Sequence, residues 1–186
     1  KVRAIGISNC YAWQIAKALG ISAKEQLARF ELIQPMYSLV KRQAEVEILP
    51  LAASEKIGVI SYSPLGAGLL TGKYGINKRP DQGRLLEEAR YKDRYKDGNN
   101  FIVADKFSAY AEKHGVTPSS LAVAWVMSNP SITAPIIGAR NLVQLQDSLK
   151  ALDIEMTPEW REEISSLSNT PAPATDRAET LLPNWK

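Results

Sequence analysis

Apolar and polar positions along the chain follow two alternating periods. The stretch from Val2 to Ile7 is rich in β-branched residues, and apolar residues from Ala12 to Leu19 then recur every three or four positions. The first pattern is typical of a strand and the second of an amphipathic helix, with Ser8 or Asn9 as the expected N-cap. The start of the chain therefore predicts a strand, a turn and a helix.

The alternation recurs three more times along the chain. Strands are expected at 32–37, 57–62 and 134–138, and helices at 45–55, 101–114, 117–128, 141–152 and from 157. Pro50 should kink or restart the helix over 45–55, because a proline cannot donate to the turn before it. Four strand–helix units in series predict an α/β fold with a parallel sheet and helical crossovers.

Two parallel architectures agree with this pattern. An open doubly wound sheet should carry a glycine-rich dinucleotide-binding turn after its first strand, and Gly6-Ile7-Ser8-Asn9 lacks that fingerprint. The other architecture is part of a (β/α)8 barrel, the TIM barrel, whose full form needs about 250 residues and eight such units. The 186 residues of this chain hold four.

Two segments interrupt the pattern within a single expected domain over residues 1–186. Residues 75–100 are rich in charge and poor in aliphatic side chains, so they predict an excursive loop, either a flap over a site or a solvated insertion. From about residue 170 the chain holds Pro171, Pro173 and Pro183, and an irregular tail is expected there.

Composition narrows the functional classes. The net charge is +3, with 23 basic and 20 acidic side chains, too balanced to indicate a nucleic-acid or membrane surface. No apolar run reaches the roughly 18 residues of a membrane span, and the first residues lack the apolar region of a signal peptide, so a cytoplasmic protein is expected. His114 and Cys10 are the only histidine and cysteine, which excludes an internal disulfide and a zinc cluster, and no metal site is expected.

Four motifs lie at the ends of the four predicted strands. They are the segments Gly6–Asn9, Gln34–Ser38, Tyr62–Tyr74 and Pro135–Arg140. In this order they resemble the second half of an aldo-keto reductase, and the resemblance covers nearly the whole chain. It implies a (β/α)8 TIM barrel of which this chain holds strands five to eight: four βα units, a C-terminal helix and a tail. Barrel enzymes place their sites at the carboxyl ends of the strands, where these motifs lie.

The resemblance also implies a binding site for NADP(H). Ser8, Asn9 and Gln34 would hydrogen-bond the nicotinamide carboxamide, which both donates and accepts, and Tyr62 would stack against the nicotinamide ring. The turn after the third strand would approach the pyrophosphate with glycines and backbone N–H groups, assisted by two cations. These residues are Ser63, Pro64, Leu65, Gly66, Gly68, Lys73 and Arg84.

The region after the fourth strand would bind the adenosine 2′-phosphate and ribose. It opens a helix whose dipole and unpaired amides attract phosphate, and its residues are Gly138, Arg140, Gln144 and Asp147. A charge-assisted hydrogen bond contributes about 1.5–3 kcal/mol, so one contact from Arg140 would favour NADP over NAD by about 10- to 150-fold. Ser148 stands where relatives often carry an asparagine to the adenine.

The implied activity is that of an NADP-dependent aldo-keto reductase, which transfers hydride from NADPH to an aldehyde or ketone, a small carbonyl substrate. In this family a tyrosine acid acts with a lysine, an aspartate and usually a histidine, all on strands of the first half-barrel. None of those strands is recognisable here, so we assign no catalytic residue and expect His114 to lie on the surface. The chain is expected to be a fragment of a longer reductase and inactive by itself.

Half a parallel barrel has two open edges and an uncovered apolar face. The expected partner is therefore the missing N-terminal half-barrel or a second copy of the chain. Two other functions are open at this point. One is an NADP-binding regulatory subunit of the same fold with little turnover, and the other is a catalytically empty half-barrel dimer with a structural role.

Overall fold

One parallel sheet of four strands organises the fold. The computed structural model describes residues 1–176, and its strands are β1 (Ile5–Ser8), β2 (Phe30–Gln34), β3 (Gly58–Tyr62) and β4 (Ala134–Ile136). They lie side by side in chain order, and every neighbouring pair is parallel. A parallel connection must cross back along the sheet, and helices make these crossings. The predicted α/β class is confirmed, although the second and fourth strands end earlier than predicted.

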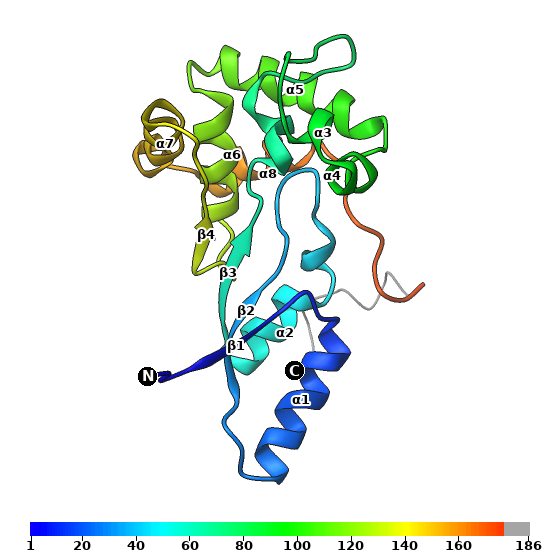
Figure 1. Ribbon diagram of the computed structural model, residues 1–186, viewed down its shortest axis with the longest axis vertical. Helices are drawn as coiled ribbons and strands as arrows, with labels where there is room; N and C mark the ends of the chain where they lie inside the picture. Colours follow the sequence, from blue (N-terminus) through cyan, green and yellow to red (C-terminus); the bar gives the residue numbers. More distant parts are fainter. Residues whose placement is uncertain (177–186) are drawn as a thin grey trace.

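Six helices account for most of the other regular structure. They are α1 (Ala12–Lys24), α2 (Ile48–Glu55), α5 (Asn99–Lys113), α6 (Pro118–Met127), α7 (Leu142–Leu149) and α8 (Pro158–Ser165). In Figure 1, β3 rises toward α5 and α6, while α1 and α2 lie beside the lower part of the strands. Thr117 Oγ1 caps α6, accepting from the Ser120 N–H. Thr157 Oγ1 caps α8 in the same way, accepting from the Trp160 N–H.

The predicted cap of α1 is wrong. Neither Ser8 nor Asn9 caps this helix, because its N-cap is Tyr11, whose N–H donates to Gln14 Oε1 at 3.0 Å. Side-chain hydrogen bonds at the edge of the sheet hold Ser8 and Asn9 instead, as described below.

Two other helices are shorter than their sequence patterns predict. A 3₁₀ turn over Gln43–Glu45 precedes α2, which starts afresh at Ile48. Pro50 therefore lies in the first turn, where the helix needs no N–H donor. The helix expected over 141–152 ends at Leu149, and a 3₁₀ turn over Lys150–Asp153 follows it.

The segment over 75–100, expected as an irregular loop, contains two short helices. They are α3 (Arg84–Glu87) and α4 (Ala89–Arg94). A second apolar core ties them to the turn after β3, and its buried residues are Leu69, Tyr74, Leu85, Tyr95 and Ala104. Gly83 is required in this packing, because a Cβ there would clash with the Tyr74 hydroxyl oxygen. Of the predicted tail, residues 170–176 form no helix or strand, and the rest, including Pro183, lies outside the described residues.

Trp125 of α6 lies at the centre of the main core. Its indole is fully buried, stacks on the Tyr37 ring with 5.2 Å between centroids, and donates from Nε1 to Ser165 Oγ at 3.0 Å. The guanidinium groups of Arg42 and Arg161 lie over the same indole, 5.8 and 4.5 Å from the ring centroid. We refer to Tyr37, Arg42, Trp125, Arg161 and Ser165 as the Trp125 hub.

Polar groups inside the Trp125 hub are paired. The Tyr37 hydroxyl donates to Glu45 Oε1 at 2.7 Å and accepts from Arg161 Nη2 at 2.9 Å. Arg42 Nη2 pairs with Glu45 Oε2 at 2.9 Å, and Arg42 Nη1 donates to the Ser165 carbonyl oxygen at 3.0 Å. Burial and the hydrogen bond to Glu45 raise the pKa of Tyr37, so its phenol stays protonated. The hub thus joins the chain after β2 to the last helix.

The two faces of the sheet differ in what they carry. Ile33 and Val59 are buried in the main core. On the opposite face Gly6, Leu32 and Gly58 stand in register across β1, β2 and β3. A Cβ on Gly6 would lie 3.0 Å from the Leu32 carbonyl oxygen, and one on Gly58 would lie 3.1 Å from Leu32 Cδ1. The two glycines therefore make room for Leu32 on this face.

Unpartnered surfaces lie at both ends of the sheet. Within the described residues, β1 and β4 each pair on one side only. Next to β4 in the chain, α7 exposes Leu142, Val143 and Leu149 by 65, 69 and 45%. No helix within residues 1–176 is long and apolar enough to cross a membrane.

Candidate functional site

Three of the predicted site residues are the last residues of their strands. Ser8 ends β1, Gln34 ends β2 and Tyr62 ends β3. Parallel strands end at the same edge of a sheet, and Ser8 and Gln34 are direct partners in register. The structure therefore brings together the residues expected at the nicotinamide, with Asn9 next to Ser8.

Hydrogen bonds connect these residues into one cluster. Ser8 Oγ donates to the Gln34 carbonyl oxygen at 2.9 Å, and Asn9 Nδ2 donates to Ser8 Oγ at 2.8 Å. The Tyr62 hydroxyl donates to Asn9 Oδ1 at 2.6 Å. Asn9 has a φ of +56°, in the left-handed region that asparagine tolerates better than most residues. The Asn9 amide is thus fixed from both sides at the carboxyl edge of the sheet.

The turn after β3 has a left-handed backbone at several positions. Ser63, Gly66 and Gly68 have φ values of +61°, +55° and +98°. The N–H groups of Gly66 and Gly68 donate to the carbonyl oxygens of Ser63 and Leu65, at 2.9 and 3.0 Å. These two N–H groups are used inside the turn, so in this conformation they are not the phosphate donors that the sequence led us to expect.

Positive charge at this turn comes from Lys73. A Cβ added to Gly68 would lie 3.0 Å from Lys73 Cε and 3.5 Å from its Nζ, so the ammonium group lies over this glycine. Pro64 is buried and the Leu65 side chain packs against the main core, so both take part in the packing of the turn. We therefore regard the turn as a support for Lys73.

Two arginines extend this positive region. Burial, followed by the positive charges of Arg140 and Arg84, lowers the pKa of Lys73, while the negative charge of Glu87 raises it. Arg140 Nη2 lies 4.0 Å from Glu87 Oε2. The cluster thus contains three cations and one carboxylate. We call Lys73, Arg84, Glu87 and Arg140 the cation cluster.

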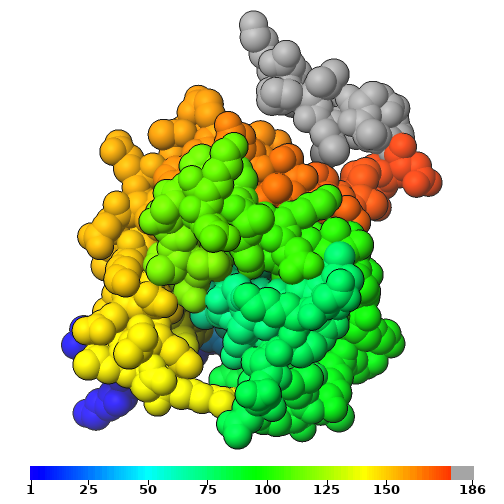
Figure 2. Space-filling model, turned by 90° about the horizontal axis from the view of Figure 1, so that it is seen from above, coloured from blue at the N-terminus to red at the C-terminus, as the bar shows by residue number. Residues whose placement is uncertain are grey.

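A hollow opens at this end of the molecule. Figure 2 looks onto it from above: yellow atoms of the connection after β4 and teal atoms of the chain after β3 border the hollow and meet at one side. The Arg140–Glu87 pair joins these two segments. The hollow is therefore bordered by both predicted phosphate-binding regions.

The residues predicted to bind the 2′-phosphate and ribose lie in the loop after β4 and in α7. Asn141 Oδ1 caps α7 by accepting from the Gln144 N–H at 3.0 Å, and Gln144 Oε1 accepts from the Arg140 N–H at 3.0 Å. The Asp147 carboxylate accepts from Lys150 Nζ at 3.1 Å. A Cβ on Gly138 would meet no atom within 4 Å. Of these residues, Arg140 is the one whose side chain approaches another member of the cation cluster, Glu87.

Ser148 does not face a ligand. Its side chain is buried, and its hydroxyl donates to the Gln144 carbonyl oxygen at 3.1 Å. The adenine contact that the resemblance implies at this position is therefore not provided by the Ser148 side chain in this structure.

Sequence reasoning missed two residues of the site, Glu87 and Tyr95. The Tyr95 hydroxyl donates to Met36 Sδ at 3.8 Å, beside the carboxyl end of β2, and burial raises the pKa of Tyr95 to about 12. Leu85, Tyr91 and Tyr95 were the available signal, since they are bulky side chains recurring within a charged stretch. Their role depends on contacts with distant residues, which local periodicity does not show.

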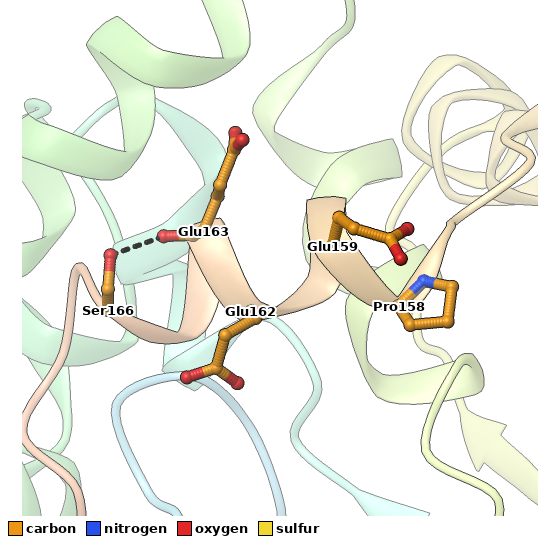
Figure 3. Close-up of a pocket in the computed structure, with 5 residues that line it drawn as sticks. All are labelled: Pro158, Glu159, Glu162, Glu163 and Ser166. Atoms are coloured by element: carbon orange, nitrogen blue, oxygen red, sulfur yellow. Dashed lines mark hydrogen bonds between the residues drawn. The ribbon is translucent and has the colours of Figure 1, made fainter.

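Other features of the described residues lie apart from this cluster. His114 is exposed, as expected, and stacks on Tyr110 with 4.3 Å between ring centroids. A shallow hollow on α8, shown in Figure 3, is lined by Pro158, Glu159, Glu162, Glu163 and Ser166 and includes none of the predicted site residues. Residues 1–176 contain no group of three histidine, cysteine, aspartate or glutamate side chains able to hold a metal ion.

Comparison with known proteins places the chain in a family. The profile of the Aldo/keto reductase family matches residues 1–169. The chain is 34% identical over 178 residues to the uncharacterized oxidoreductase YrpG of Bacillus subtilis, covering 96% of this chain and 52% of that protein. It is 31% identical over 176 residues to protein tas of Escherichia coli, covering 93% and 51%. It is 36% identical over 156 residues to a probable voltage-gated potassium channel subunit beta of Arabidopsis thaliana, covering 80% and 46%.

The chain belongs to the aldo/keto reductase family, and its relatives include oxidoreductases. The (β/α)8 barrel of this family agrees with four parallel strands and their helices as half a barrel. The chain spans about half the length of the curated relatives it matches.

Proposed function

We propose that the chain is the cofactor-binding half of an NADP-dependent aldo-keto reductase that reduces an aldehyde or ketone. The observation that carries the proposal is one hydrogen-bonded cluster, Ser8, Asn9 and Tyr62, at the same end of the sheet as the cation cluster. A nicotinamide ring and phosphate groups need these two environments together. NADPH, when bound, supplies the hydride; the residues of this chain bind and orient it.

The donors and acceptors of the cluster fit a carboxamide. An amide ligand presents one acceptor and two donors, and the side chains of Ser8, Asn9 and Gln34 offer hydroxyl and amide groups of both kinds. The bonds from Asn9 Nδ2 to Ser8 and from Tyr62 to Asn9 Oδ1 orient the amide before any ligand arrives. Preorganisation of this kind lowers the entropic cost of binding.

The cation cluster fits two phosphate-bearing groups. Lys73 over Gly68 would neutralise a pyrophosphate, with Arg84 nearby, and Arg140 would pair with a 2′-phosphate. Gln144 holds the loop that presents Arg140 through its bond to the Arg140 N–H, and Gly138 and Asp147 are proposed to contact the nucleotide in the same region. Arg140 is the basis of the proposed preference for NADP over NAD.

The catalytic groups are proposed to lie outside this chain. The resemblance implies that the catalytic tyrosine, lysine and aspartate belong to strands of the first half-barrel. The 186 residues alone should therefore be inactive. The open edges of β1 and β4 and the exposed apolar residues of α7 are the surfaces that an N-terminal half-barrel, or a second copy of the chain, would cover.

Binding and turnover together test the proposal. Titration of the protein with NADPH and NADH, followed by quenching of protein fluorescence, should show saturable binding with the stronger affinity for NADPH. A panel of aldehydes and ketones should not be reduced by the 186 residues alone. Absence of saturable NADPH binding would refute the cofactor assignment, and carbonyl reduction by these residues alone would refute the placement of the acid outside them.

A second function is favoured by one relative. The Arabidopsis protein is described as a probable voltage-gated potassium channel subunit beta, and this chain is 36% identical to it. An NADP-binding regulatory subunit would bind NADPH as tightly as a reductase does and reduce carbonyls slowly. Single-turnover rates of NADPH oxidation in the complete barrel separate the two functions.

Replacing Tyr62 should separate its ring from its hydroxyl. Tyr62→Ala removes both and is expected to weaken NADPH binding by about 2- to 12-fold, the range for an aromatic stacking contact. Tyr62→Phe keeps the ring and removes the bond to Asn9, so its loss should be smaller. Calorimetric titration of both variants measures the difference. Equal losses would assign Tyr62 to orienting Asn9, and unchanged affinity in both would remove it from the site.

A further inference from the structure

Glu87 is the one carboxylate in the cation cluster, and its two oxygens have different partners. Oε1 accepts from the Gly83 N–H at 2.9 Å, at the start of α3. Oε2 lies 4.0 Å from Arg140 Nη2. The backbone bond fixes one oxygen, and this aims the other at Arg140. The side chains of Arg140 and Glu87 are 61% and 49% exposed, so a ligand can reach both.

The Arg140 guanidinium cannot pair fully with two anions at once. A guanidinium pairs with a carboxylate through the same N–H groups that pair with a phosphate. Glu87 Oε2 lies beside the same guanidinium with which a 2′-phosphate would pair. The same carboxylate also counters the positive charge around Lys73, which links it to the rest of the cluster.

We propose that Glu87 is a built-in competitor for the phosphate of the nucleotide, holding Arg140 in the free protein and regaining it as the nucleotide leaves. The inference rests on the proposed NADP(H) site. A phosphate monoester carries a charge near −2 and three acceptor oxygens, so it displaces a single carboxylate. Glu87 thus lowers NADP(H) affinity by the strength of its pair with Arg140, and this favours release, a step that limits many enzymes.

Glu87→Gln tests the competition with little disturbance of α3. The glutamine keeps an oxygen that can accept from Gly83 and loses the charge that holds Arg140. The matched control is Glu88→Gln, which makes the same change of charge one residue away, where Glu88 pairs with Arg90 at 3.3 Å. Calorimetry with NADPH, NADH, adenosine 2′,5′-bisphosphate and AMP isolates the contribution of the 2′-phosphate.

The expected result is specific to the phosphate. Glu87→Gln should tighten the binding of NADPH and of adenosine 2′,5′-bisphosphate by about two- to fivefold, the range for an exposed ion pair. The gain for NADH and AMP should stay clearly smaller than for the two ligands with a 2′-phosphate, because Glu87 affects them only through the charge around Lys73. Glu88→Gln should change the affinity for all four ligands by less than about twofold. The gain should shrink at high salt, and it should vanish when Arg140→Ala is introduced, because the pair is then absent.

Each other outcome overturns the inference. Equal effects of Glu87→Gln and Glu88→Gln would show that the gain in affinity comes from a general change of charge and not from Arg140. Weaker binding by Glu87→Gln would make Glu87 a support for the nucleotide, and a gain that persists in the Arg140→Ala background would break the link between the two residues. If the unaltered protein binds neither NADPH nor the bisphosphate, the proposed function itself is wrong and the inference falls with it.

Discussion

Arg140→Ala is expected to weaken NADPH binding by about 10- to 150-fold while leaving NADH binding nearly unchanged. The range is that of one charge-assisted hydrogen bond to a phosphate. The Arg140 side chain is 61% exposed, and solvent screening places the effect toward the lower end. Only the nucleotide with a 2′-phosphate loses a partner, so the ratio of the two affinities is the informative quantity.

The control for this prediction is another arginine. Arg90 of α4 pairs with Glu88 and lies over the Tyr91 ring, 5.1 Å from its centroid, so Arg90→Ala removes a similar charge from outside the cation cluster. Dissociation constants for NADPH and NADH should be measured for both variants at one salt concentration. Equal losses for both nucleotides in Arg140→Ala would exclude the 2′-phosphate contact.

Trp125→Ala is expected to lower the free energy of unfolding by about 3–5 kcal/mol, the range for deleting a large buried aromatic side chain. The side chain is 0% exposed and gives up its stack on Tyr37 and its hydrogen bond to Ser165. The loss also leaves Arg42 and Arg161 beside a cavity.

Urea denaturation followed by far-ultraviolet circular dichroism measures the change. Trp13→Ala is the matched control, because Trp13 is 62% exposed, and its effect should stay within about 0.5 kcal/mol. A loss for Trp125→Ala as small as that for Trp13→Ala would show that the Trp125 hub does not stabilise the fold.

Strands and several helix starts could be predicted because their signals are local. The first and third strands were predicted to end close to Ser8 and at Tyr62, and parallel order then places these side chains at one edge, although the end of the second strand at Gln34 came three residues earlier than predicted. Thr117 and Thr157, each followed by a proline, begin helices as expected. A parallel sheet was therefore enough to predict that the residues assigned to the nicotinamide lie close together.

What the sequence did not reveal depends on distant contacts. The α3 and α4 helices lie in a highly charged stretch, and buried partners such as Tyr74 and Ala104 hold them in place. In the sequence Glu87 looks like any other acidic residue, and only the fold shows that Arg140 lies opposite it. The N–H groups of Gly66 and Gly68 were expected to be free, and only the folded turn shows that they are already used.

The pairing inside the Trp125 hub also has a consequence for how the chain folds. Arg42 donates to the Ser165 carbonyl oxygen, across a sequence separation of 123 residues. Contacts of such long range form slowly, because a large loop must close before they contribute. Tyr37 and Arg42 find all their partners only once α8 is present, because the Tyr37 hydroxyl accepts from Arg161 and Arg42 donates to the Ser165 carbonyl oxygen. We therefore expect the segment after β2 to complete its packing late, and to be more open to proteases until α8 has docked.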